Sequence, residues 1–305
     1  MKAYLDLLDR ILTEGTDKSN RTGTGTRFLP NLFFSHDMAK GFPLLTSKRV
    51  PMKIVAVELE GFIKGVTDKR WFQERGCHIW DSWCNPITAE NSYNEDSGVT
   101  WEDHCKSIDD LGPIYGHQWT KFGKATDETM RSFDYDTYLI EEDHVRSGAN
   151  QLQYVIDTLK TNPNDRRMVV SAWNPNSIDE MALPPCHYTF CVTHCNGVVN
   201  LHWTQRSADF FLGVPFNIAS YGLLLELICK ETDMIPGNLS GTFCDAHIYD
   251  DHIDQCKEQL SRDIRILPSV EISGKEDFDI FSWTHKDMIM VGYDPHPTIK
   301  GSVSI

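Results

Sequence analysis

The sequence predicts a protein of mixed helices and strands, in the α/β or α+β class. Three observations carry this prediction: apolar residues at helical spacing near the N-terminus, two extended runs on either side of Asn196-Gly197, and a long apolar stretch after Pro215. The 305 residues lie within the range of a single large enzyme domain. Because we find no internal repeat and no low-complexity linker, we expect one catalytic domain over residues 1–305.

The first elements are a helix and an extended segment. Apolar residues recur at helical spacing over residues 4–12, and Gly15 follows as a stop signal, so a helix is predicted there. A loop rich in Gly and Thr occupies residues 21–26. Residues 28–34 then look extended, which predicts a strand.

Two further helices are predicted along the chain. Residues 55–63 form a mostly apolar helical pattern that contains Glu58 and Glu60. A carboxylate on a buried helix is costly unless it is paired or used in chemistry. The second pattern covers residues 152–159 and stops at the run NPND.

Two stretches rich in Asp, Glu, Asn and Ser predict surface insertions. They lie near residues 86–111 and 124–147 and show little periodicity. Their sequences indicate nothing about chemistry, and a place on the rim of the domain is the expectation.

A β-hairpin and a long buried helix are predicted in the second half. The runs 188–195 and 198–205 flank Asn196-Gly197, a dipeptide that favours a type I′ turn because both turn positions require positive φ. Pro215 then opens a strongly apolar segment, which we interpret as a central helix.

The composition restricts the class of partner and the compartment. A net charge of −15 and a pI near 5.2 oppose nonspecific binding of DNA or RNA, although a local group of arginines can still bind a small anion. No apolar run approaches the length of a membrane span, and the N-terminus does not look like a signal peptide. We therefore expect a cytoplasmic protein. In that reducing compartment the nine cysteines, an odd number scattered along the chain, are interpreted as core thiols with one reactive thiol.

Cys186 is the candidate nucleophile. It follows Pro184 and Pro185, which stiffen its approach, and precedes His187 at the start of the hairpin. A thiolate is the reactive form, and nearby cations such as Arg206 would favour it. For a single cysteine, an inert buried thiol is the more common alternative.

Residues 205–209 (Gln-Arg-Ser-Ala-Asp) group a guanidinium, a hydroxyl and a carboxylate after the second hairpin strand. Such a group suits the binding of an anion. A surface salt bridge is the alternative interpretation.

Two patterns superficially resemble metal sites. His247 and His252 have an H-x4-H spacing, but no third ligand appears at a known spacing. Cys191, His194 and Cys195 fall on a strand whose alternation divides them between two faces. We therefore expect no metal.

Seven motifs together resemble the thymidylate synthase family and run in the family's order from about residue 20 to the C-terminus. They are NRTGTGT, GFPLLTSKR, NPNDRRMVVSAWNP, LPPCHYTF, QRSADFFLGVPFNIASY, GTFCDAHIYDDHI and YDPHPTIKGSVSI. The resemblance implies an α+β fold in which a large mixed β-sheet has flanking helices, in two or three layers. It also implies a homodimer that joins sheet to sheet.

The resemblance implies a one-carbon transfer to the pyrimidine of dUMP. Cys186 would attack C6 of uracil and make C5 nucleophilic, while Asn217 would bind N3 and O4. Glu58 would order water and Tyr115 would help to remove the C5 proton. The implied catalytic residues are Cys186, Glu58, Tyr115, Asn217, Asp209, Arg206 and His187.

The substrates implied are dUMP and 5,10-methylenetetrahydrofolate, with no metal and no nucleic acid as main ligand. Arg166 and Arg167 would reach the phosphate from the second subunit of the homodimer, and Asp209 would meet the pterin ring. The implied dUMP site is Arg21, Arg166, Arg167, Gln205, Arg206, Ser207, Asn217, His247 and Tyr249. The implied folate site is Lys48, Ile79, Trp80, Trp83, Leu183, Asp209, Gly213, Phe216 and Ile305.

Two fates remain open for the exocyclic methylene that this chemistry creates. Hydride from tetrahydrofolate gives dTMP, whereas water gives a hydroxymethyl nucleotide, as in a dUMP hydroxymethylase. Trp80 and Ile305 are expected to exclude water. The chain has Glu60 and Gly61 where the family usually has Leu and Trp, and a second carboxylate there could orient a water; neutral repacking is the alternative.

A nonenzymatic nucleotide-binding or RNA-binding homologue is the alternative of a different class. Retention of Cys186, Tyr115, Asp209 and Asn217 argues against it, as does the acidity of the chain. A cytosine-specific relative would carry Asp in place of Asn217, so uracil is the expected base.

Overall fold

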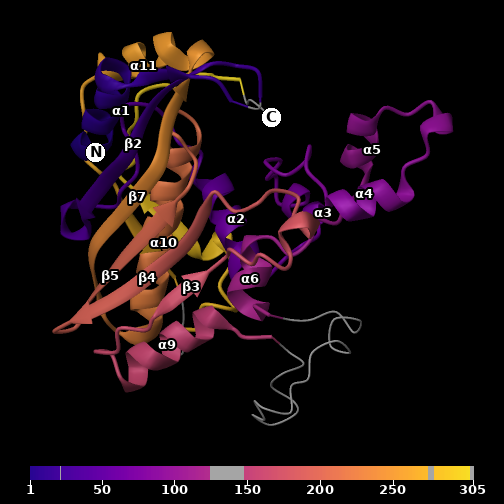
Figure 1. The fold of residues 1–305 in the computed structure, drawn as a ribbon. Coiled ribbons are helices and arrows are strands. Elements are labelled where there is room, and N and C mark those ends of the chain that lie inside the picture. The colour runs from indigo at the N-terminus through magenta and orange to yellow at the C-terminus, as the bar shows by residue number, and fades with distance from the viewer. Residues whose placement is uncertain (21, 124–147, 274–277, 303–305) are drawn as a thin grey trace.

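The computed structural model describes residues 1–20, 22–123, 148–273 and 278–302, and its centre is a mixed seven-stranded sheet (Figure 1). The strand order is β1-β2-β7-β5-β4-β3, and β6 pairs with β7. The β5–β7 and β6–β7 pairs are parallel, and the other pairs are antiparallel. The strands are β1 Thr16–Lys18, β2 Thr26–Asp37, β3 Val169–Ser171, β4 His187–Cys195, β5 Val198–Gln205, β6 Ala208–Asp209 and β7 Ile235–Tyr249.

Helices flank this sheet, so the predicted α+β class with a large mixed sheet is confirmed. The α-helices are α1 Lys2–Glu14, α2 Met52–Ile63, α3 Lys69–Gln73, α4 Pro86–Ser92, α5 Trp101–Ser107, α6 Tyr115–Lys121, α9 Gln151–Thr161, α10 Gly213–Thr232 and α11 Ile253–Leu260. Strands β8 (Ser269–Ile272) and β9 (Met288–Val291) form a separate antiparallel pair. In the part of the chain that the structure describes, no helix is both long and apolar enough to cross a membrane.

The predicted hairpin is confirmed, and its turn has the expected backbone. Asn196 has φ 52° and Gly197 has φ 80°, both in the left-handed region that a type I′ turn requires. Strand β4 begins one residue earlier than predicted, at His187. The turn therefore fixes which side chains of β4 and β5 lie on each face of the sheet.

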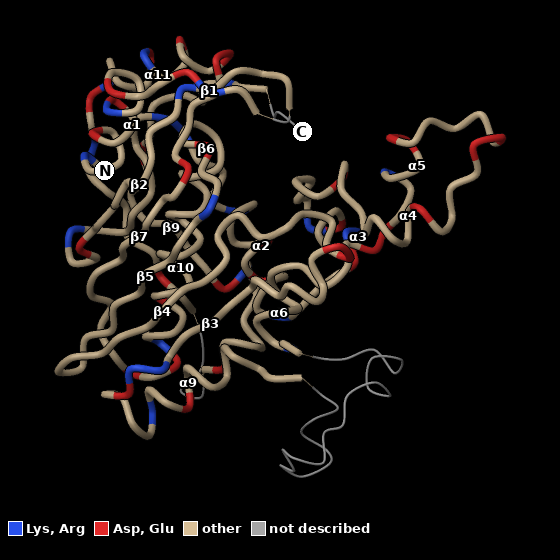
Figure 2. Tube along the Cα trace, viewed as in Figure 1, with Lys and Arg blue, Asp and Glu red and all other residues tan. Residues whose placement is uncertain are grey.

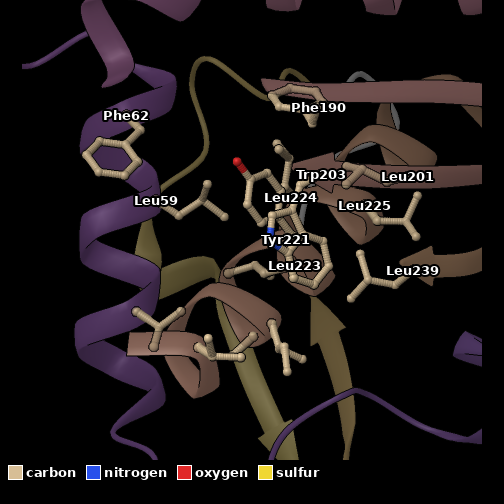
Figure 3. Close-up of a cluster of buried hydrophobic side chains, with 14 of the residues drawn as sticks. Leu59, Phe62, Phe190, Leu201, Trp203, Tyr221, Leu223, Leu224, Leu225 and Leu239 are labelled. Atoms are coloured by element: carbon tan, nitrogen blue, oxygen red, sulfur yellow. The ribbon is translucent and has the colours of Figure 1, made fainter. Parts of the chain in front are cut away.

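One face of the sheet is covered by the long helix α10, and α2 packs on that helix in turn. Along β5 every second residue is buried, including Leu201 and Trp203. Figure 3 shows these side chains against Tyr221 of α10, with Leu59 and Phe62 of α2 beside them. In the described part of the chain, no helix lies over the opposite face (Figure 1).

Helix α10 begins at Gly213, two residues before the predicted start at Pro215. Proline has no amide hydrogen to donate, but the first turn of a helix leaves those hydrogens unpaired anyway, so Pro215 fits there. The helix ends at Thr232, and its C-cap residue Asp233 has φ 53°.

The first predicted insertion, residues 86–111, forms an arm that projects from the body (Figure 1). It contains α4 and α5, each seven residues long, joined through the short 3-10 turn Glu95–Ser97. Its surface is largely exposed and carries acidic side chains (Figure 2). Such short helices leave little amphipathic pattern in a sequence. The second predicted insertion, 124–147, lies outside the described residues.

Candidate active site

Cys186 is anchored by its backbone from two directions. Its amide donates to the hydroxyl oxygen of Tyr115 at 2.7 Å, and its carbonyl accepts from the amide of Arg206 at 2.8 Å. Tyr115 begins α6, whereas Arg206 follows β5. The candidate nucleophile is therefore held between a helix and the end of the hairpin.

The guanidinium of Arg206 stabilises the loop that carries Cys186. Its Nε donates to the carbonyl of Pro185 at 3.0 Å and its Nη2 to the carbonyl of Pro184 at 2.7 Å. The guanidinium also lies over the ring of Trp173, at 5.6 Å from the centroid. A permanent positive charge is thus bound to the two residues that precede the cysteine.

His187 is buried and holds no charge near neutral pH. Burial lowers its pKa to about 3, and its Nδ1 lies 2.9 Å from the hydroxyl of Tyr221. Its ring stacks on Tyr115 with centroids 4.3 Å apart. His187 therefore orients Tyr115 by packing, and it adds no positive field at Cys186.

Glu58 of α2 is close to the same aromatic group. The indole nitrogen of Trp80 donates to its Oε1 at 3.1 Å. Burial raises the pKa of Glu58 to about 7, although the bond from Trp80 acts in the opposite direction. Phe62 connects the two halves of the site, since its ring contacts both Tyr115 and Trp80. A carboxyl that titrates near pH 7 is suited to proton transfer.

Glu60 faces away from Glu58, because residues two apart on a helix point about 200° apart. Its Oε1 pairs with Lys64 at 2.6 Å, and its Oε2 accepts from the amide and Nδ1 of His285 at 2.9 and 2.7 Å. Burial alone would raise the pKa of Glu60, but these bonds outweigh it and lower the pKa. The carboxylate that departs from the family pattern is thus fully occupied elsewhere.

The space at Gly61 is filled by aromatic rings from α3. A Cβ at Gly61 would lie 2.2 Å from Cε1 of Phe72 and 3.2 Å from Cζ3 of Trp71. Phe72 is completely buried. Neutral repacking, one of the two interpretations of this departure, therefore has a visible physical basis.

Asn217 is oriented by a chain of hydrogen bonds. Its Oδ1 accepts from Nε2 of Gln205 at 3.1 Å, and the same nitrogen donates to the carbonyl of Ser207 at 2.9 Å. Oε1 of Gln205 accepts from the indole of Trp203 at 3.3 Å. Gln205 is 2% exposed, so its contacts are to protein groups, and it orients Asn217.

His247 and Tyr249 lie on the same face of β7, with ring centroids 5.3 Å apart. Nδ1 of His247 lies 2.9 Å from Oδ1 of Asp245, and Oδ2 of the same carboxylate pairs with Lys18. The carboxylate favours the proton on Nδ1 and leaves Nε2 as the acceptor of the ring.

Asp209 and Lys48 lie near the start of α10. Oδ1 of Asp209 accepts from the amides of Phe211 and Leu212 at 2.9 and 3.1 Å. Lys48 is 5% exposed, and its ammonium contacts both the carbonyl and the ring of Phe211. Burial lowers the pKa of Lys48 to about 8, against the attraction of Asp209.

The remaining predicted site residues differ in how they are placed. Trp80 is 4% exposed, whereas Ile79 beside it is 41% exposed. Arg166 and Arg167 are exposed in the single chain. Trp83, Leu183, Ser207, Gly213 and Phe216 are half-buried. Arg21 and Ile305 lie outside the described residues.

Two positioning residues escaped the sequence reasoning. Tyr221, which binds His187, lies four residues after Asn217 on one helix, and Asp245, which binds His247, lies two residues before it on one strand. A spacing of four on a helix and a spacing of two on a strand each place the two residues on one face. These spacings could have indicated both pairs. In the described part of the chain, no three His, Cys, Asp or Glu side chains are grouped as metal ligands.

The comparison with protein families agrees with these contacts. A family model described as thymidylate synthase matches residues 2–305, which is nearly the whole chain. This family consists of one-carbon transferases that act on dUMP with methylenetetrahydrofolate. With the match extending over both the sheet and the residues around Cys186, the chain belongs to the thymidylate synthase family.

Proposed function

We propose that the protein is a thymidylate synthase, which converts dUMP and 5,10-methylenetetrahydrofolate to dTMP and dihydrofolate. The observation that carries the proposal is the connected group around Cys186. Tyr115 binds its amide, Trp80 binds Glu58, and Phe62 contacts both aromatic rings. Packed aromatic side chains thus connect the candidate nucleophile to the carboxyl proposed for proton transfer.

In the proposed reaction, Sγ of Cys186 forms a bond to C6 of uracil, and the ring electrons move to O4. C5 then attacks the methylene carbon of the folate. Asn217 stabilises the negative charge on O4, and its orientation by Gln205 makes this donor preorganised. Oδ1 of Asn217 accepts the N3 hydrogen, which favours uracil over cytosine.

The C5 proton then leaves through the group of Tyr115, Glu58 and water. Tyr115 keeps its own proton in the resting state, because burial raises its pKa well above the ordinary value. Loss of tetrahydrofolate leaves an exocyclic methylene, and transfer of a hydride from tetrahydrofolate converts this to methyl. Cys186 leaves as the C5–C6 double bond re-forms.

Two observations support hydride over water as the final reactant. Trp80 is nearly buried, in contact with both Glu58 and Tyr115. Glu60, the extra carboxylate, is paired with Lys64 and His285 on the other side of α2. Neither observation favours a role for Glu60 in orienting water. The dUMP hydroxymethylase is the alternative that the product analysis below distinguishes.

We also propose a homodimer in the cytoplasm. Among the described residues no helix covers the sheet face opposite α10, and this face includes Phe33 with 60% exposure. An exposed apolar residue on an uncovered sheet fits a sheet-to-sheet interface. In this dimer Arg166 and Arg167 are donated to the phosphate of the other subunit's nucleotide.

Mass analysis of the nucleotide product tests the reaction. Purified protein is incubated with dUMP and methylenetetrahydrofolate, alongside the Cys186→Ala variant. Methyl product with dihydrofolate is expected from the wild type alone. Hydroxymethyl product with tetrahydrofolate would establish the hydroxymethylase, and no difference between wild type and variant would reject the enzyme.

Mixing two inactive variants tests the dimer. In a mixed dimer of Cys186→Ala with the double variant Arg166→Ala/Arg167→Ala, one of the two sites is intact. Random exchange should then recover about a quarter of wild-type activity. Exchange without recovery, detected with differently tagged subunits, would show that the arginines do not act across an interface.

A further inference from the structure

Cys84 and Cys105 form a pair of thiols at the base of the projecting arm, away from the candidate nucleophile. Cys84 immediately precedes the N-cap of α4, and Cys105 lies within α5. Both are reduced in the structure. The Cys105 thiol lies close enough to raise the pKa of Cys84, although the two residues are 21 positions apart in the sequence.

A buried lysine holds this pair in place. Nζ of Lys69 donates to the carbonyl of Cys105 at 3.2 Å and to the carbonyl of Trp83 at 3.3 Å. One ammonium therefore fixes the backbone of Cys105 and of the residue next to Cys84. Lys69 is 1% exposed, so this bridge is part of the packed interior.

The two thiols differ in access. Cys84 is 7% exposed, whereas Cys105 is half-buried on an arm whose surface is open to solvent. Cys105 is therefore the thiol that an oxidant meets first, and Cys84 is the neighbour that can resolve the product.

We propose that Cys84 and Cys105 form a reversible disulfide in the presence of a low-molecular-weight disulfide such as oxidised glutathione. The Cys105 thiolate attacks one sulfur of the oxidant and releases one glutathione thiolate. The Cys84 thiolate then attacks Sγ of Cys105 and releases the second. The two protons lost by the cysteine thiols are taken up by the two glutathione thiolates, so one oxidised glutathione becomes two reduced molecules.

The new bond would fasten the arm to the segment that carries Trp80 and Trp83. In the structure hydrogen bonds make this link, among them those that Lys69 donates to the carbonyls of Trp83 and Cys105. A covalent closure would restrict local opening of α4 and α5. Ring closure should be slow at neutral pH, because burial and contact with Cys105 raise the pKa of Cys84 to about 12.

Peptide mapping tests the proposal directly and does not depend on the catalytic function. Trypsin leaves residues 76–106 as one peptide, since no Lys or Arg lies between Arg75 and Lys106. After oxidation with glutathione disulfide and alkylation, this peptide should carry one alkyl group, on Cys77, whereas the reduced peptide carries three. Cleavage after Glu90 and Glu102 should leave two fragments that separate only on reduction.

Variants identify the partners. Cys77 shares the tryptic peptide, so Cys77→Ala serves as the matched control and should retain the link. Cys84→Ala and Cys105→Ala should each reduce the linked fragment by at least about tenfold. In the wild type, an alkyl group located on Cys77 by fragmentation of the linked peptide would itself assign the bond to Cys84, so a misfolded Cys84→Ala protein would not affect the result.

Two results would overturn the proposal. One is stable glutathione on Cys105 with no linked fragment in the wild type. The other is a link that survives in Cys84→Ala but is lost in Cys77→Ala, which would make Cys77 the partner.

Discussion

Trp80 donates the hydrogen of its indole to Oε1 of Glu58 across 3.1 Å, which ties a helix carboxyl to the loop that precedes the arm. The bond does not prevent burial from raising the pKa of Glu58 to about 7. Near neutral pH the carboxyl is therefore present both with and without its proton. Glu58, which is expected to order water, can then gain or lose a proton at a small cost in free energy.

Replacement of Glu58 by Gln should lower kcat by about 10²–10³-fold, because the amide keeps the shape but cannot exchange a proton. The KM for dUMP should change little, since Glu58 is not among the expected nucleotide contacts. Steady-state kinetics at pH 7 measure both. A kcat within threefold of wild type would remove Glu58 from the proton path.

The same variant should change stability in a pH-dependent way. Because folding raises the pKa of Glu58, the carboxyl stabilises the fold most below about pH 4.5 and loses that contribution as pH rises through about 7. Glu58→Gln should thus gain up to about 3 kcal/mol on wild type at pH 8, less where solvent reaches the carboxyl. Denaturant unfolding at pH 5 and pH 8 measures this, with exposed Glu90→Gln as control.

Replacement of Glu60 by Leu should destabilise the protein and leave its chemistry alone. His285 is 8% exposed in its side chain and would lose its acceptor, at a cost of about 2 kcal/mol. The methyl-to-hydroxymethyl product ratio should stay that of the wild type. An altered ratio would contradict the separation of Glu60 from Glu58, and Glu60→Gln provides the isosteric comparison.

Removal of the Gln205 side chain should weaken use of dUMP through Asn217. Gln205→Ala leaves Oδ1 of Asn217 without its donor, so kcat/KM should fall by roughly tenfold to a hundredfold. In the background of Asn217→Ala the same change should cost much less. Equal losses in both backgrounds would mean that Gln205 acts independently of Asn217.

Replacement of Gly61 by Ala should cost about 1–3 kcal/mol, because the new methyl meets the ring of Phe72 in a packed core. The better helix propensity of Ala offsets part of this cost. Combining Gly61→Ala with Phe72→Leu should reduce the penalty relative to the sum of the single changes. Additive thermal or urea midpoints would argue against direct contact.

Much of the fold could be predicted from local patterns. The turn at Asn196-Gly197 needed only its backbone preference, and the helices around Glu58 and after Pro215 needed only apolar periodicity. The strand order, with β7 between β2 and β5, could not follow from those patterns, because it depends on contacts between distant segments. The family resemblance supplied the mixed sheet.

The candidate site, like the fold, could be predicted only in part from the sequence. Motifs identified Cys186, Asn217 and Glu58, and each lies among polar or aromatic partners in the structure. Spacing could not reveal that Glu60 pairs with His285, 225 residues away in the sequence. It also could not show that His187 is neutral, since that follows from burial.

The ring of Phe72 occupies the volume in front of Gly61, so one aromatic group is delivered to this part of the core from a different helix. The same space in the core can therefore be filled by an aromatic side chain from either of two helices. Among relatives, residues 61 and 72 should vary together, with a bulky side chain at one accompanied by a small one at the other. The glycine at position 61, considered alone, would then look like the loss of a functional aromatic residue, although Phe72 compensates for it.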